Sequence, residues 1–90
     1  MRLKNNFELR QLSPKTYILE MVDYSGGDFN KIVTFNSSAA FLWNSLSSKE
    51  FSTLDVANLL KEKYGIDEDI AIADATSLLD TWNKNSLIEI

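Results

Sequence analysis

Carboxylates are the commonest side chains in this sequence that could bind a metal ion or transfer a proton. Asp67, Glu68 and Asp69 are consecutive, and hard cations such as calcium bind several carboxylate oxygens. Their spacing differs from that of a calcium-binding loop, whereas acidic residues at the start of a helix are stabilised by the helix dipole. We therefore interpret these three residues as a helix start and expect no metal site.

The other polar residues do not form a recognisable catalytic set. The sequence has no histidine and no cysteine, which removes the commonest general base and the thiol nucleophile. Ser37 and Ser38 have no neighbouring base and are interpreted as helix-capping residues. Asp74 and Asp80 fall on different sides of a helix, and the "SGGD" of residues 25–28 lacks the lysine of a phosphate-binding loop. We predict a non-catalytic protein that needs no cofactor.

Length and hydropathy predict one globular domain. The chain has 90 residues, of which 44% are hydrophobic, and we assign residues 1–90 to a single domain. No apolar run approaches the ~20 residues of a membrane span. The N-terminal residues also lack the apolar segment of a secretory signal. We therefore expect a cytoplasmic protein with no membrane partner.

The charge is unevenly distributed along the chain. Residues 1–64 hold eight basic and seven acidic residues, whereas residues 65–90 hold one basic and six acidic residues. The acidic C-terminal part would repel a phosphate backbone. This pattern argues against a nucleic-acid partner.

The first half of the chain has the periodicity of β-strands. Residues 7–12 alternate apolar and polar side chains, and Pro14 follows in a turn-like segment. Residues 16–24 are rich in β-branched and aromatic side chains, and residues 31–35 form a similar run after the turn at residues 25–28. Alternation sets three residues of each of the first two strands on one face: Phe7, Leu9 and Gln11, then Tyr17, Leu19 and Met21.

The second half has the periodicity of helices. Asn36 or Ser37 is expected to cap a first helix, in which Ala39, Leu42, Trp43 and Leu46 form one apolar stripe. Ser52 and Asp55 resemble a capping box at the start of a second helix, and Gly65 is placed to end it. The expected buried faces of the second and third helices are Val56, Leu59, Leu60 and Lys63 or Tyr64, then Ala71, Ala75, Leu78, Leu79 and Trp82. Residues 87–90 are an apolar tail that can pack on the core.

The order of elements predicts the fold class. Three strands joined by short loops must be antiparallel, and a small sheet needs helices to cover its apolar face. We predict an α+β fold of winged-helix type, in which a three-stranded antiparallel sheet precedes a three-helix bundle.

With these elements in place, the sequence resembles the PqqD family, whose members chaperone the precursors of ribosomally made, modified peptides. The resemblance covers nearly the whole chain. It is carried by Phe35, Asn36, Ser38, Ala39, Leu42 and Trp43 at the strand–helix junction, by Thr53, Val56, Ala57, Leu60 and Tyr64, and by Asp74, Ala75, Leu78, Leu79, Trp82, Leu87 and Ile88. Ser86 stands where the family usually has glycine.

The resemblance implies a leader-peptide recognition module. Such a module captures the leader of a precursor peptide by β-strand addition and presents it to a modifying enzyme, such as a radical enzyme. The implied peptide-binding residues are the strand edge Lys31, Ile32, Val33, Thr34 and Phe35, and the helix flank Ile72, Thr76, Leu79, Asp80 and Asn83.

Two other functions remain open from the sequence. The same strand edge could serve a structural role, by bridging subunits or by pairing two copies in a homodimer. A winged helix could also bind DNA, but the third helix offers one lysine and several carboxylates, which disfavours contacts to phosphates.

Overall fold

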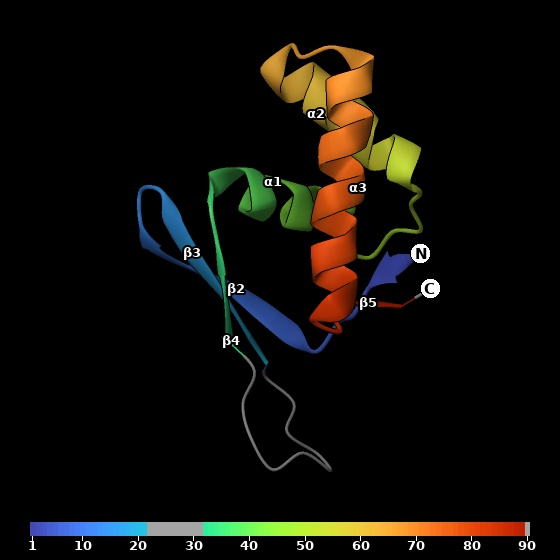
Figure 1. The fold of residues 1–90 in the computed structure, drawn as a ribbon. Coiled ribbons are helices and arrows are strands. Elements are labelled where there is room, and N and C mark those ends of the chain that lie inside the picture. Colours follow the sequence, from blue (N-terminus) through green and yellow to red (C-terminus); the bar gives the residue numbers. More distant parts are fainter. Residues whose placement is uncertain (22–31, 90) are drawn as a thin grey trace. The chain divides into compact units, whose positions relative to one another are not determined.

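The structure is a computed structural model, and it describes residues 1–21 and 32–89. The elements in chain order are β1 (Arg2–Leu3), β2 (Phe7–Ser13), β3 (Thr16–Met21), β4 (Ile32–Phe35), α1 (Ser37–Leu46), α2 (Thr53–Tyr64), α3 (Glu68–Lys84) and β5 (Ile88–Glu89) (Figure 1). The chain divides into two compact units, which we call the sheet unit (residues 4–45) and the helical unit (residues 1–3 and 46–90).

The sheet unit is built on an antiparallel sheet with strand order β2-β3-β4. This sheet and the three helices that follow it confirm the predicted α+β class. Pro14 and Lys15 form the turn between β2 and β3. The predicted turn at residues 25–28 lies outside the described residues, as does Lys31.

The strand register confirms the predicted faces. Leu9 lies opposite Leu19, and Leu19 lies opposite Val33, so these three residues share one face of the sheet. Leu19 is fully buried, which identifies this face as the inner one. The regular pairing of β2 with β3 runs from Phe7 to Gln11 and then shifts, which leaves Leu12 in a bulge.

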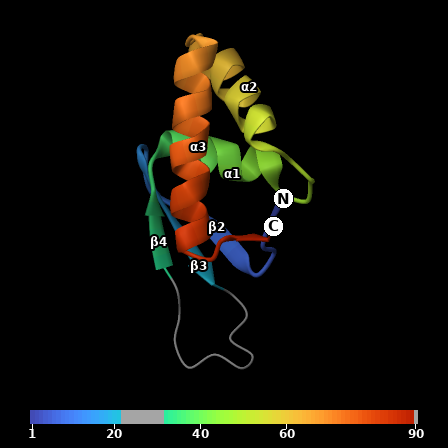
Figure 2. The ribbon, with the colours of Figure 1, turned by 45° about the vertical axis from the view of Figure 1, so that its right-hand side comes forward.

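The helical unit is built on α2 and α3, which lie side by side (Figure 2). The predicted capping box is confirmed: the Asp55 amide donates to the Ser52 hydroxyl at 3.2 Å, and the Ser52 amide donates to the Asp55 carboxylate at 2.8 Å. Gly65 ends α2 in the left-handed conformation, also as predicted. The buried residues of the two helices are Val56, Ala57, Leu60, Ala71, Ala75, Leu79 and Trp82.

The prediction that Lys63 or Tyr64 is buried was wrong, because both are exposed. These residues form the last turn of α2, directly before the connection to α3. At the end of a helix pair, fewer neighbouring residues are available to cover a side chain.

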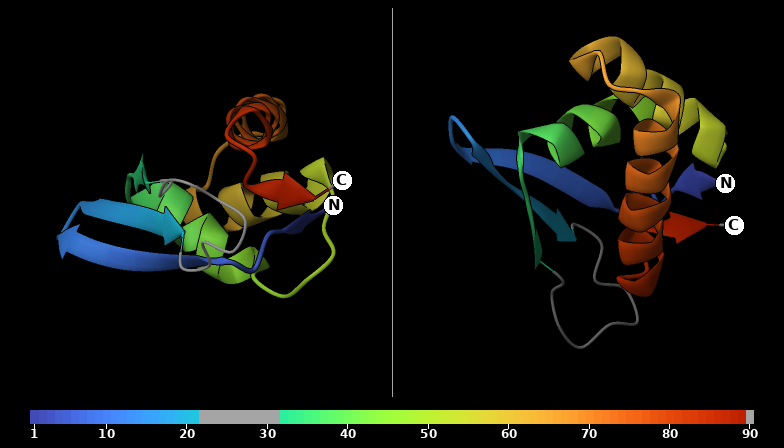
Figure 3. Two further views of the ribbon diagram at one scale, coloured as in Figure 1. Left: turned by 90° about the horizontal axis from the view of Figure 1, so that it is seen from below. Right: turned by 45° about the horizontal axis from the view of Figure 1, so that its top comes forward.

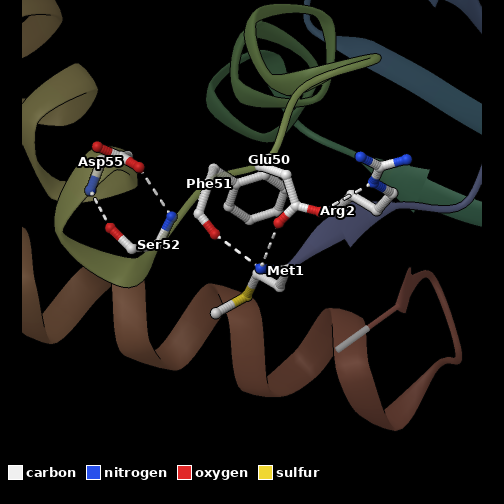
Figure 4. Close-up of polar contacts among 6 residues, drawn as sticks. All are labelled: Met1, Arg2, Glu50, Phe51, Ser52 and Asp55. Carbon is white, nitrogen blue, oxygen red and sulfur yellow. Dashed lines mark hydrogen bonds and ion pairs between the residues drawn. The ribbon is translucent and has the colours of Figure 1, made fainter.

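The two chain ends pair in a short sheet that the sequence did not predict. Leu3 lies opposite Ile88, and Arg2 lies opposite Glu89, in an antiparallel pair (Figure 3). Figure 4 shows two further contacts of this region: the Arg2 Nε lies 3.1 Å from a Glu50 carboxylate oxygen, and the Met1 amino group donates to the Phe51 carbonyl at 3.0 Å. The apolar tail therefore packs as expected, since Leu87 and Ile88 are buried, but it does so as a strand.

The end of α3 has the hydrogen bonds of a Schellman motif. The Leu87 amide donates to the Trp82 carbonyl and the Ser86 amide to the Asn83 carbonyl, both at 3.0 Å. Ser86 has a φ of +61°, in the left-handed region that glycine adopts without strain. Within residues 1–21 and 32–89, no helix is both long and apolar enough to cross a membrane.

This conformation predicts that Ser86→Gly raises the free energy of unfolding by about 1 kcal/mol, because glycine lacks the Cβ that strains a left-handed residue. Gly65→Ala is the matched opposite change. Gly65 has a φ of +62° and open space around an added Cβ, so that substitution should cost about 1 kcal/mol through backbone strain alone. Urea unfolding measures both values. A loss of stability in Ser86→Gly would contradict this account.

Candidate functional site

The outer edge of β4 is the candidate site. β4 pairs with β3 on one side, and among the described residues no strand pairs with its other side. In an antiparallel strand, every second residue points its N–H and C=O groups away from the existing partner. β4 therefore presents backbone donors and acceptors that an extended peptide could satisfy.

Aromatic packing holds β4 against α1. Phe35 is buried, and the centre of its ring lies 5.8 Å from the centre of the Trp43 ring in an edge-on arrangement. Phe7 of β2 packs against the same Trp43 ring, also edge-on, with 6.2 Å between the ring centres. Trp43 thus joins both outer strands of the sheet to one helix.

The junction between β4 and α1 is short and capped. Asn36 is the single residue between the two elements, and its side-chain oxygen accepts a hydrogen bond from the Ala39 amide at 2.9 Å. Asn36 is therefore the N-cap, which confirms one of the two predicted capping residues. This junction gives β4 little freedom to change its direction relative to α1.

The side chains of β4 differ between its two faces. Ile32 is 58% exposed and Thr34 is also exposed, on the outer face. Val33 is half-buried and Phe35 is only 4% exposed, on the inner face. The Phe35 side chain therefore belongs to the core, whereas the side chains of Ile32 and Thr34 are accessible. Lys31, the first residue of the predicted edge, lies outside the described residues.

The predicted residues of α3 form one exposed stripe with one exception. Ile72, Thr76, Asp80 and Asn83 are exposed and recur at the spacing of a single helix face. Leu79 is only 6% exposed, which confirms its predicted place on the buried face of α3; its contact with a peptide stays a prediction. Burial of this leucine on the inner face of α3 is favourable.

Two side chains of the exposed stripe make polar contacts within α3. The Thr76 hydroxyl donates to the Ile72 carbonyl at 2.8 Å, and the Asp80 carboxylate lies 3.1 Å from the Lys84 ammonium. β4 and α3 belong to different units, and the prediction that their surfaces act together on one peptide stays a prediction.

β2 forms the other edge of the sheet, but it has features that oppose strand addition. It carries Glu8 and Arg10, and its regular pairing ends at the bulge of Leu12. Charged side chains and bulges are common devices for protecting an edge. β4 has neither a charged residue nor a proline. The alternating charges of Glu8 and Arg10 were a signal in the sequence for a second sheet edge, which was not predicted.

The acidic residues 67–69 lie at the start of α3, as predicted. The Glu68 carboxylate lies 3.5 Å from the Lys61 ammonium, and α3 begins directly after Asp67. Among the residues that the structure describes, no group of three His, Cys, Asp or Glu side chains is arranged to hold a metal ion.

The central role of Trp43 gives a stability prediction. Trp43→Ala should lower the free energy of unfolding by about 3–5 kcal/mol, because it leaves a cavity and removes the ring that contacts both outer strands. Asn44→Ala, at an exposed position of the same helix, is the control. Chemical denaturation followed by circular dichroism measures the difference. Similar losses for the two variants would contradict the role assigned to Trp43.

Comparison with known proteins identifies a family model that matches most of the chain. Residues 12–88 match the family model described as Coenzyme PQQ synthesis protein D (PqqD). The matched range contains β3, β4 and all three helices. Neither the curated proteins nor the solved structures yielded a match.

Proposed function

Since the chain belongs to the PqqD family, we propose that it is a non-catalytic module that captures the leader of a precursor peptide and presents it to a modifying enzyme. The family description associates the chain with coenzyme PQQ synthesis. The proposal adds the mode of capture, which is strand addition to β4. Because ribosomes make such precursors in the cytoplasm, the encounter is assigned to that compartment.

The observation that carries the proposal is the uncharged outer edge of β4. A four-residue strand directs half of its backbone groups outward, which allows about four hydrogen bonds to an added strand. At about 0.5–1.5 kcal/mol each, these bonds give roughly 2–6 kcal/mol. Association itself costs at least about 4 kcal/mol. Backbone pairing alone is therefore too weak for stable capture.

Side chains must supply the remaining affinity and the selectivity. Ile32 is exposed on the outer face of the sheet, where it offers an apolar contact to a side chain of the added strand. The α3 stripe (Ile72, Thr76, Asp80 and Asn83) is retained in the proposal as a second contact for the leader. Its polar residues can form hydrogen bonds with side chains of the leader, and Ile72 can contact an apolar side chain of the leader. The modifying enzyme, of which a radical enzyme is one candidate, would receive the peptide in this extended form.

A backbone test separates strand addition from side-chain binding. The probe is the synthetic leader of a precursor encoded next to this chain, added to ¹⁵N-labelled protein. We expect amide shift changes at residues 32–35 and along the α3 stripe. Two leader variants are compared, one N-methylated at every even position and one at every odd position. One variant should lose binding and the other should bind nearly as well as the unmodified leader, because only one set of amides faces β4. Equal effects in both variants would contradict strand addition.

A pair of substitutions tests the edge itself. Ile32→Lys should weaken leader binding at least about tenfold, because it removes the apolar contact and places a charge on the edge. Leu12→Lys is the matched control, since Leu12 is 64% exposed and lies in the bulge of the other edge strand. Isothermal titration calorimetry gives both affinities. The proposal fails if the two variants bind the leader equally well.

A further inference from the structure

The outer edge of β2 has a charge pattern that is complementary to itself. β2 pairs with β3 alone among the described residues, and its regular stretch runs from Phe7 to Gln11. Glu8 and Arg10 are exposed on the outer face of this stretch. The family match begins at residue 12, so family membership gives no account of these residues.

One of these charges lacks compensation within the sheet. Glu8 lies directly opposite Glu20 on β3, and like charges in that arrangement repel. The Arg10 Nε lies 3.5 Å from the Glu20 carboxylate, so the available cation is drawn toward β3. Among the described residues, the ion pairs do not include Glu8. A cation beyond the β2 edge would stabilise Glu8.

Symmetry limits the ways in which two β2 edges can pair. Residues that lie directly opposite each other in an antiparallel pair share a face. A symmetric pair must therefore set one residue of β2 opposite its own copy, and the two-fold axis lies between these two copies. We name each axis after that residue. An axis at Glu8 sets two glutamates against each other, and an axis at Arg10 sets two arginines against each other. An axis at Leu9 sets each Glu8 opposite the Arg10 of the other copy.

The register centred on Leu9 also uses the whole regular stretch. Leu9 is the middle residue of Phe7–Gln11, so Phe7 then lies opposite Gln11 of the second copy. The bulge at Leu12 falls just outside the paired segment. The charge pattern and the length of the regular stretch therefore select the same register.

We propose that two copies of this chain associate through antiparallel pairing of their β2 edges, with the two-fold axis at Leu9. The combined sheet has the order β4-β3-β2-β2-β3-β4, so both β4 edges stay open at its far ends. This inference is independent of peptide capture by β4. Five paired residues bury far less than the ~1,200 Å² of a standard interface, so the dimer is weak and its population depends on protein concentration.

Charge reversal gives the test. The wild-type chain should show a concentration-dependent monomer–dimer equilibrium in sedimentation velocity at low salt. Glu8→Lys and Arg10→Glu should each weaken self-association at least about tenfold, because each sets like charges opposite one another twice. An equimolar mixture of the two variants should form a heterodimer, since the new lysine then faces the new glutamate and Arg10 faces Glu8.

The mixture keeps the test valid even if one variant is less stable. Arg10→Glu also removes the contact with Glu20, and circular dichroism reports whether that variant is folded. The heterodimer requires two folded chains and the register centred on Leu9. A wild-type chain that stays monomeric would overturn the proposal. Dimers that persist in both variants, or a mixture that does not associate, would also overturn it, because the contact would then lie elsewhere, for example at β4.

Discussion

The sheet unit depends on the packing of one indole ring. Trp43 contacts Phe7 of β2 and Phe35 of β4, so the two outer strands share one support on α1. Asn36 makes the junction between β4 and α1 short and capped. An edge strand held in this way is extended before any peptide arrives. A peptide that pairs with it then pays little for ordering the protein, which is the physical basis of preorganised binding.

The same sheet has two edges with different chemistry. β4 offers an uncharged edge with an exposed isoleucine, whereas β2 carries opposite charges two residues apart and ends its regular pairing at a bulge. An uncharged edge accepts many extended partners, and selectivity must come from side chains beside it. A charged edge rejects most partners and accepts a strand with the matching pattern. The partner with the matching pattern can be a second copy of the same strand.

Local signals in the sequence were sufficient for the features that depend on neighbouring residues. The capping box of Ser52 and Asp55 and the left-handed Gly65 follow from residue types at fixed spacings. The edge of β4 was predicted only from the resemblance to the PqqD family. The pairing of β1 with β5 was not predicted, because two-residue strands have no periodicity and each strand pairs with a segment at the other end of the chain. The bulge at Leu12 likewise depends on cross-strand register, whereas the burial of Leu79 followed from its place on the apolar stripe of α3. Ser86 shows how the two kinds of information combine: a departure from the family pattern was visible in the sequence, and its left-handed φ gives that departure a physical cost.

The geometry of the proposed dimer determines how the two edges relate. Five strand spacings of about 4.8 Å separate the two β4 strands of a six-stranded sheet, which is roughly 24 Å. An added leader runs along β4 and not across the sheet, so one leader segment cannot pair with both edges at once. Each copy would therefore capture its own peptide, and dimerisation would leave the affinity of a single leader unchanged. A modifying enzyme that contacts both copies would be held more tightly than one that contacts a single copy, because the second contact forms at a high effective concentration.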